Sequence, residues 1–238
     1  MGQPLAINFL RSALLIIDVQ NDFCPGGELG VEKGDEVIGP LNRLSSLFAA
    51  RAGRVAATQD WHPEGHVSFA ASHQNKKPGE MLELKEMKVQ VPERKTGPDQ
   101  SRCSGPRQQV LWPIHCVQGS RGADFHEKLD LRPVNLIIRK GFRTALDSYS
   151  AFFENDRKTS TGLDGFLKAL SIDTLVLGGL ATDYCVLYSA LDAAALGYRT
   201  IVAEDAVRGV DFPKGSVDQA FTALREAGVV ITGSEDVR

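Results

Sequence analysis

One segment of the chain passes directly from an apolar strand into a helix, and it constrains the fold more than any other. Residues 174–177 form an apolar run of strand character that breaks at two consecutive glycines. Thr182 and Asp183 are suited to a helix N-cap, and the helix-forming residues that follow end at Gly197. This order places Cys185 in the first turn of a helix, beyond the carboxyl end of a buried strand.

A cysteine at such a position can carry chemistry. Exposed backbone N–H groups and the positive end of the helix dipole would stabilise a thiolate at Cys185. In open α/β sheets, the crevice beyond the carboxyl ends of the strands is also where ligands bind. The alternative is a small, buried, apolar cysteine, and the segment alone does not decide between the two.

Apolar runs and helical patterns alternate along most of the chain. The predicted strands are residues 13–19, 54–59, 134–139, 173–178, 199–203 and 229–232. The predicted helices are residues 35–52, 163–171, 183–196 and 214–227. Alternation of helices with fully apolar strands predicts an α/β fold, in which a mostly parallel sheet has helices on both faces. A chain of 238 residues can bury one large core, although two small domains would also fit.

The alternation is interrupted between residues 74 and 110, which are rich in Lys, Glu, Pro and Gly. Leu82, Leu84, Val89 and Val91 indicate a short hairpin, and the rest of the segment is typical of solvated loop. It has too few apolar residues for a core of its own. We therefore predict one domain over residues 1–238, with an inserted loop or hairpin at about 74–110.

Charge argues against nucleic-acid and membrane partners, and cysteine content indicates the compartment. A net charge of −3 and a pI near 6.0 give no reason to expect nucleic acid or an anionic membrane. Four cysteines in a chain of this length are too sparse for a disulfide scaffold, which favours a reducing, cytoplasmic compartment. The sequence leaves open whether copies of the chain form a homo-oligomer.

Histidines and a carboxylate gather in two segments that could hold a metal ion. Asp60 and His62 follow a predicted strand two residues apart, so an extended backbone points both side chains the same way. His115 could supply a third ligand, and His66 a fourth ligand or a partner of one. Two imidazoles and a carboxylate suit Zn²⁺, Fe²⁺ or Mn²⁺. The alternative is that these are capping and surface histidines.

Two further charged residues lie at predicted strand ends. Asp18 closes an apolar strand, where desolvation would raise its pKa and make it a plausible proton acceptor. Lys140 follows another strand and so reaches the same edge of the sheet. Together with Cys185 they supply a base, a balancing charge and a nucleophile. An ordinary Asp–Lys ion pair at the sheet edge is the alternative.

Six motifs in order carry a resemblance to a known family. They are DVQNDF at 18–23, DWHP at 60–63 with HVSF at 66–69, WPIHC at 112–116, GADFH at 122–126, KG at 140–141 with DSYSAF at 147–152, and GLATDYC at 179–185. In these motifs the chain resembles the nicotinamidases of the isochorismatase-like cysteine hydrolase superfamily. The resemblance covers most of the chain, and residues 74–110 are the main departure from it.

The resemblance implies a single three-layer domain with a six-stranded parallel sheet, a catalytic site and a metal site. The implied catalytic triad is Asp18, Lys140 and Cys185, with backbone N–H groups of Ala181 and Cys185 as the oxyanion hole. The implied metal ligands are Asp60, His62 and His115, holding one divalent ion, with Zn²⁺ expected first and Fe²⁺ or Mn²⁺ as alternatives. Phe23, Trp112 and Tyr149 match positions that wall the substrate pocket, and the peptide bond between Leu180 and Ala181 would be cis.

The implied activity is hydrolysis of nicotinamide to nicotinate and ammonia through a thioester on the cysteine, as a step of NAD salvage. A related cysteine amidohydrolase for another small amide, such as an N-carbamoyl compound, is the main alternative, although such relatives generally lack the metal cluster. A non-haem iron oxygenase would usually have an all-β scaffold. A non-catalytic binding protein would not need every triad position to be filled.

Overall fold

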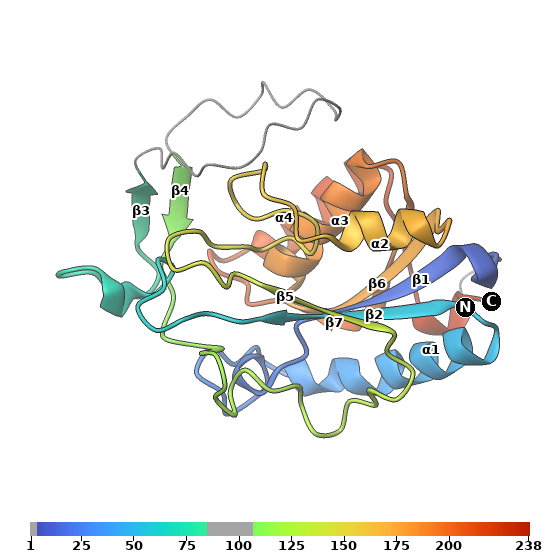
Figure 1. The fold of residues 1–238 in the computed structure, drawn as a ribbon, viewed down its shortest axis with the longest axis horizontal. Helices are drawn as coiled ribbons and strands as arrows, with labels where there is room; N and C mark the ends of the chain where they lie inside the picture. The colour runs from blue at the N-terminus through green and yellow to red at the C-terminus, as the bar shows by residue number, and fades with distance from the viewer. Residues whose placement is uncertain (1–3, 85–106) are drawn as a thin grey trace.

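The computed structural model describes residues 4–84 and 107–238, and the centre of the molecule is a parallel sheet (Figure 1). Its strands are β1 Ser12–Ile17, β2 Arg54–Asp60, β5 Leu136–Lys140, β6 Thr174–Leu180, β7 Arg199–Arg208 and β8 Val230–Thr232. They form a six-stranded sheet in the order β5-β2-β1-β6-β7-β8, and every neighbouring pair is parallel. This architecture confirms the predicted fold class.

Helices cover both faces of the sheet. The helix α1 Ile38–Ala50 lies on one face, and α2 Leu163–Ala169, α3 Leu187–Ala195 and α4 Ser216–Glu226 lie on the other (Figure 1). Successive side chains of a strand point to opposite faces, so β1 contributes to two cores. Leu14 belongs to the apolar cluster that contains Leu41 of α1, whereas Leu15 belongs to the cluster that contains Ala190 of α3. The central strand is therefore buried on both sides, which explains its continuous apolar run.

All six predicted strands are present, with one clear difference in length. β7 continues to Arg208, five residues beyond the predicted end at 203. Glu204 and Asp205 interrupt the apolar run, so the sequence pattern predicts a strand that ends before them. Asp205 fits into the strand because its carboxylate accepts hydrogen bonds from the Ser234 backbone N–H at 2.7 Å and from the Ser234 hydroxyl at 2.6 Å.

The predicted helices are present, but two of them begin as tighter or wider turns. The helix predicted over 35–52 is a 3₁₀ turn, Gly34–Val37, followed by α1. Pro40 lies in the first turn of α1, where its missing N–H leaves no helical hydrogen bond unmade. The helix predicted over 183–196 begins as a π-helical turn, Thr182–Val186, which contains Cys185 and leads into α3.

The expected capping role of Thr182 and Asp183 is wrong. Ala181 occupies the N-cap position, and no side chain caps this helix. The carboxylate of Asp183 instead accepts hydrogen bonds from the backbone N–H groups of Val210 at 3.0 Å and Asp211 at 2.9 Å, and from the Ser216 hydroxyl. Asp183 therefore holds the loop after β7 against the helix that carries Cys185.

A two-stranded antiparallel sheet stands outside the main sheet (Figure 1). Its strands are β3 Met81–Leu84 and β4 Arg107–Val110, and Leu82 lies opposite Gln109. Leu82 and Leu84 were predicted to belong to a hairpin, and both lie in β3. Val89 and Val91, the other residues of that prediction, lie outside the described residues.

The order of the strands creates a crevice at their carboxyl ends. β1 lies at the centre of the sheet, with β2 on one side and β6 on the other. The chain fills one half of the sheet with β2 and β5 before it crosses to the other half with β6, β7 and β8. Ligand sites of open α/β sheets lie at such a point. Asp18 follows β1 and Cys185 follows β6, so both lie at this crevice. Among residues 4–84 and 107–238, no helix has the length and apolar character needed to cross a membrane.

Candidate active site

Three predicted catalytic residues meet at the crevice between β1 and β6. Lys140, the last residue of β5, points its ammonium toward both of the others. Its Nζ lies 2.8 Å from Asp18 Oδ2 and 3.5 Å from Cys185 Sγ. Asp18 and Lys140 are fully buried, and Cys185 is 5% exposed. The structure therefore brings together a carboxylate, an amine and a thiol from three different strand ends.

Two contacts that sequence reasoning missed hold this group in place. The Thr58 hydroxyl donates a hydrogen bond to Asp18 Oδ1 at 2.6 Å, and it accepts one from the Asp18 backbone N–H at 3.2 Å. The backbone carbonyl of Ser148 accepts a hydrogen bond from Lys140 Nζ at 3.0 Å. Thr58 lies in β2, next to β1 in the sheet, and only the strand order reveals this pairing.

The charges of this group are set by burial and by mutual attraction. Burial lowers the pKa of Lys140, but the carboxylates of Asp18 and Asp60 outweigh it and hold that pKa well above its ordinary value. Burial raises the pKa of Asp60, yet Lys140 and His62 hold it below its usual range. Burial also raises the pKa of Asp18, and here the opposing effect of Lys140 does not overcome it. Lys140 and Asp60 therefore form the charged pair, and Asp18 is the carboxylate disposed to take a proton.

The surroundings of Cys185 favour the protonated thiol over the expected thiolate. Burial raises the pKa of its thiol well above the usual value; Lys140 opposes this shift, and Asp18 and Asp60 add to it. Burial and the two carboxylates thus act against the thiolate that the helix end was expected to stabilise. The thiol needs a base, and Asp18 is placed to be one.

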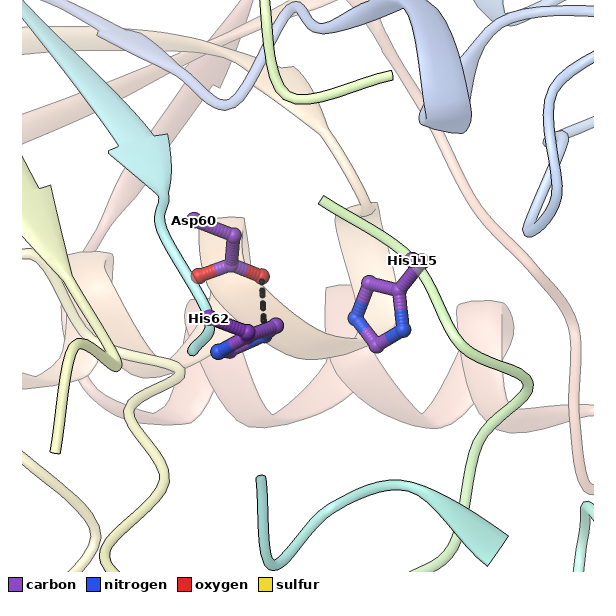
Figure 2. A group of neighbouring side chains, drawn as sticks. All are labelled: Asp60, His62 and His115. Carbon is purple, nitrogen blue, oxygen red and sulfur yellow. Dashed lines mark ion pairs between the residues drawn. The ribbon is translucent and has the colours of Figure 1, made fainter. Parts of the chain in front are cut away.

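The three predicted metal ligands lie side by side next to this group. One donor atom each from Asp60, His62 and His115 lie within 4.8 Å of one another, and all three side chains are buried (Figure 2). Asp60 is the last residue of β2, His62 lies just beyond it, and His115 comes from a separate loop, as Figure 2 shows. His62 Nε2 lies 3.6 Å from Asp60 Oδ2.

The hydrogen bonds of the two imidazoles fit them for a metal ion. His62 Nδ1 lies 2.8 Å from the Gly141 carbonyl, and His115 Nδ1 lies 2.8 Å from the Pro113 carbonyl. A carbonyl only accepts, so each Nδ1 carries a proton, and Nε2 is the nitrogen of each ring that is left to bind a metal in place of a proton. Burial lowers the pKa of His62, but Asp60 and Asp147 raise it more.

His66 lies behind His62 and is already bonded on both nitrogens. The two rings stack, with 4.1 Å between centroids and 20° between planes. His66 Nδ1 lies 2.7 Å from the Ser68 hydroxyl oxygen, and its Nε2 lies 3.3 Å from the Leu146 carbonyl. Burial lowers the pKa of His66 to about 4, so the ring is neutral at pH 7. In this arrangement His66 supports the ring of His62.

A pocket with aromatic walls is lined by both the thiol and the metal-ligand group. All three predicted substrate-pocket residues, Phe23, Trp112 and Tyr149, line it, together with Cys185, Ala181, Asp60, His62 and His115. Leu29, Asp147, Tyr184 and Val210 also line it and were not predicted. Tyr184 packs edge to face on Trp112, with ring centroids 4.9 Å apart. Tyr184 directly precedes the predicted nucleophile Cys185 in the sequence, and this position could have predicted that Tyr184 lines the pocket.

The backbone before Cys185 approaches β1 closely. Gly179 has a φ of +125°, and a Cβ there would lie 2.0 Å from the Ile17 carbonyl oxygen, so only glycine fits. The peptide bond between Leu180 and Ala181 is cis, as the resemblance implied. Ala181 and Cys185 both line the pocket.

The profile of the isochorismatase domain matches residues 12–236, which is nearly the whole chain. The chain belongs to the isochorismatase family. The nicotinamidase of Acinetobacter baylyi is 42% identical to it over 225 residues, covering 94% of each protein.

Two solved structures of similar proteins contain small ligands. The yeast nicotinamidase bound to the inhibitor nicotinaldehyde has a TM-score of 0.78 and 30% identity, covering 93% of this chain and 99% of its own. The pyrazinamidase of Pyrococcus horikoshii in complex with zinc has a TM-score of 0.69 and 29% identity, covering 94% of this chain and 99% of its own. Relatives with this fold thus take a pyridine-based inhibitor and a divalent metal ion.

Proposed function

We propose that this chain is a nicotinamidase, which hydrolyses the linear carboxamide of nicotinamide to nicotinate and ammonia. One observation carries the proposal: one aromatic-walled pocket is lined by Cys185 of the Asp18–Lys140–Cys185 group and by the adjoining Asp60, His62 and His115 group. A flat ring that fills this pocket can place its amide against the thiol and its ring nitrogen toward the metal-ligand group. The identity to a nicotinamidase over nearly the full chain supports the same activity.

In the first half of the reaction, Asp18 takes the proton of the Cys185 thiol and the sulfur attacks the amide carbon. The electron pair of the C=O bond moves to oxygen, where the backbone N–H groups of Ala181 and Cys185 would stabilise the negative charge. Lys140 keeps its proton and balances the charge on the sulfur and on Asp18. Both carboxylate and thiol are buried, so the proton does not exchange freely with solvent.

In the second half, protonated Asp18 gives its proton to the departing nitrogen. The C–N bond breaks, ammonia leaves, and an acyl thioester remains on Cys185. Asp18, now a carboxylate again, takes a proton from a water molecule that attacks the thioester. The C–S bond breaks, Asp18 passes this proton to the sulfur, and the acid that forms loses its proton to solvent as nicotinate, so the site returns to its starting state.

Asp60, His62 and His115 would hold one divalent transition-metal ion, for which Zn²⁺ is our first choice and Fe²⁺ or Mn²⁺ are alternatives. When bound, such an ion supplies a Lewis acid that accepts the lone pair of the pyridine nitrogen and orients the ring. The hydrogen bonds of both Nδ1 atoms to carbonyls, which leave Nε2 of each ring for the ion, support this ligand set. Support for zinc in particular comes from the Pyrococcus horikoshii relative.

We further propose a place for this activity. Conversion of nicotinamide to nicotinate recovers the pyridine ring for pyridine nucleotide synthesis, so the reaction would belong to NAD salvage. The free thiols of Cys24, Cys116 and Cys185 support a reducing, cytoplasmic compartment.

Residues 74–110 would be an insertion into one domain, since β3 and β4 lie outside the main sheet. A homo-oligomer is not required, because every residue named in the mechanism comes from one chain.

A related amidohydrolase acting on an N-carbamoyl compound has the weaker support. Such a substrate has no ring nitrogen to use the Asp60, His62 and His115 group, and no flat ring to fill the aromatic walls. The deciding experiment measures ammonia release by the purified protein from nicotinamide and from an N-carbamoyl amino acid, with and without a chelator. Release from nicotinamide that the chelator suppresses is expected. Release only from the N-carbamoyl compound would overturn the proposal, and the Cys185→Ala protein serves as the blank.

A further inference from the structure

A buried glutamine of β4 reaches from the outer two-stranded sheet to the wall of the substrate pocket. Gln109 is 2% exposed, whereas its neighbour Gln108 is exposed. The Gln109 Nε2 atom lies 2.7 Å from Asp147 Oδ2, 2.9 Å from the Val110 carbonyl and 3.3 Å from the Tyr149 hydroxyl oxygen. A carboxylate and a carbonyl only accept hydrogen bonds, so the amide nitrogen, not the amide oxygen, must face them.

The partners of Gln109 belong to the active site. Asp147 and Tyr149 both line the pocket. Tyr149 also accepts a hydrogen bond from Trp112 Nε1 at 3.3 Å. The two hydrogens of the Gln109 amide serve three acceptors, so its 3.3 Å contact with Tyr149 shares a hydrogen with one of the two shorter bonds. Between Asp147 and Tyr149 lies Ser148, whose carbonyl binds the Lys140 ammonium. Gln109 is thus bonded to both ends of the short segment that positions Tyr149 and contacts Lys140.

A second cavity lies on the other side of Tyr149. It has a volume of about 140 Å³, and Gln108, Gln109, Asp147, Tyr149 and Tyr188 are among its lining residues. Tyr149 and Asp147 line both this cavity and the substrate pocket, so Tyr149 is a partition between them. Tyr188 stacks on Tyr149 with 5.4 Å between centroids. Tyr188 packs on one face of the ring, but the cavity leaves another part of Tyr149 unpacked, so hydrogen bonds are also needed to fix its position.

We propose that Gln109 is a positioning residue that holds Tyr149 as this partition and thereby limits the substrate to an unsubstituted six-membered aromatic carboxamide. The inference rests on the proposed nicotinamidase function and adds a size limit to it. Without the amide of Gln109, Tyr149 can move toward the second cavity, and the pocket gains room for a substituent on the ring. Asp147 would at the same time lose its side-chain donor, so the segment 147–149 would lose its tie to β4.

The test compares nicotinamide with nicotinamides that carry one methyl group at each free carbon of the ring. Gln109→Met removes the donors at similar side-chain length, and Gln109→Glu places a second carboxylate against Asp147. Gln108→Glu is the matched control, because it makes the same change on the exposed side of the same strand. For each protein, kcat and KM are measured for every amide, and the unfolding temperature checks the fold.

In the Gln109 variants, KM for nicotinamide is expected to rise about 3–30-fold, the scale of one or two lost hydrogen bonds, while kcat changes about threefold or less. The preference for nicotinamide over the best methylated amide is expected to fall about tenfold or more. Gln108→Glu should keep the wild-type preference. A general structural role for Gln109 would lower activity on all amides alike and leave this preference unchanged.

Tyr149→Phe keeps the inference open to disproof if a Gln109 variant does not fold. This change removes the hydroxyl that Gln109 and Trp112 hold, so it should relax the same preference. In the double variant with Gln109→Met, the preference for nicotinamide should fall by less than the product of the two single-variant factors, because both changes act through one contact. Unchanged preference in the Gln109 variants or in Tyr149→Phe, with wild-type nicotinamide turnover present, overturns this inference alone. Absence of wild-type nicotinamide turnover overturns the proposed function and this inference with it.

Discussion

Lys140 and Asp60 join the catalytic group to the metal-ligand group. Lys140 Nζ lies 2.5 Å from Asp60 Oδ1, while Asp60 Oδ2 lies 3.6 Å from His62 Nε2. One carboxylate thus faces the ammonium with one oxygen and the metal-ligand group with the other. Loss of Asp60 is therefore expected to disturb both groups, whereas loss of His115 should disturb only the second.

Replacement of the proposed nucleophile should stop turnover without loss of the fold. Cys185→Ala is expected to release no ammonia from nicotinamide and to retain ligand binding, because a small apolar residue fits this buried position. Mass spectrometry of the wild-type protein during turnover should detect a nicotinoyl adduct on Cys185. Cys24→Ala is the control and should remain active. An adduct on Cys24 or Cys116 in place of Cys185 would contradict the assignment.

The proposed base should be needed for the rate more than for binding. Asp18→Asn is expected to lower kcat by about 10²–10⁴-fold, the range for a positioned acid–base group, with a smaller change in KM. Thr58→Val removes only the hydroxyl that bonds Asp18, and it should lower kcat by roughly 5–20-fold, the effect of one buried hydrogen bond. A near-normal kcat for Asp18→Asn would reduce Asp18 to a structural ion-pair partner.

Removal of Lys140 should damage both activity and stability. Lys140→Met leaves Asp18 and Asp60 buried without their counter-charge, and breaking such a pair costs about 3–5 kcal/mol in the free energy of unfolding. Activity must therefore be measured where the variant is shown to be folded, by circular dichroism and chemical denaturation. Full stability with normal kcat would contradict the charge-balancing role.

Metal removal should affect the ring-binding step more than the reactivity of the thiol. Stripping the ion, or the His115→Ala change, is expected to depress nicotinamide turnover strongly while the rate of Cys185 alkylation by a small reagent changes little. Benzamide, which lacks the ring nitrogen, should be a poor substrate with or without metal. A metal-free protein with full activity would remove the ion from the mechanism, and benzamide turned over as fast as nicotinamide would remove the nitrogen–metal contact.

Glu154 should make stability depend on pH in a range where most carboxylates do not. Its side chain is 1% exposed, and burial raises its pKa to about 7 although Arg143 opposes the shift. The native state then binds the proton more tightly than the unfolded chain, whose glutamate pKa is about 4.3, so stability falls as pH rises from about 4.5 to 7. The stability advantage of wild type over Glu154→Gln should decrease by roughly 1–3 kcal/mol between pH 5 and pH 8.

Chemical denaturation at several pH values measures this difference directly. Glu64→Gln, at an exposed position, is the matched control. A difference between wild type and Glu154→Gln that stays constant from pH 5 to pH 8, or that increases, would contradict the raised pKa.

The sequence alone determined the elements and the edge at which the chemistry lies. Strands such as residues 174–177 are local apolar runs, and the helix that follows is ended by a local glycine signal, so both could be predicted within a few residues. Asp18, Lys140 and Cys185 each lie at or just after a strand end, and parallel strands bring such ends to one edge. The spacing of Asp60 and His62 is likewise a local property of extended backbone.

Only the tertiary structure decided how these groups act on one another. The order of the strands places Thr58 beside Asp18, and the outer sheet places Gln109 against Asp147; both pairs are far apart in sequence, and no local pattern encodes them. The raised pKa of Cys185 and the unexpected partners of Asp183 have the same origin. Desolvation and hydrogen-bond choice depend on every element packed around a residue, whereas propensity and periodicity report only on its neighbours along the chain.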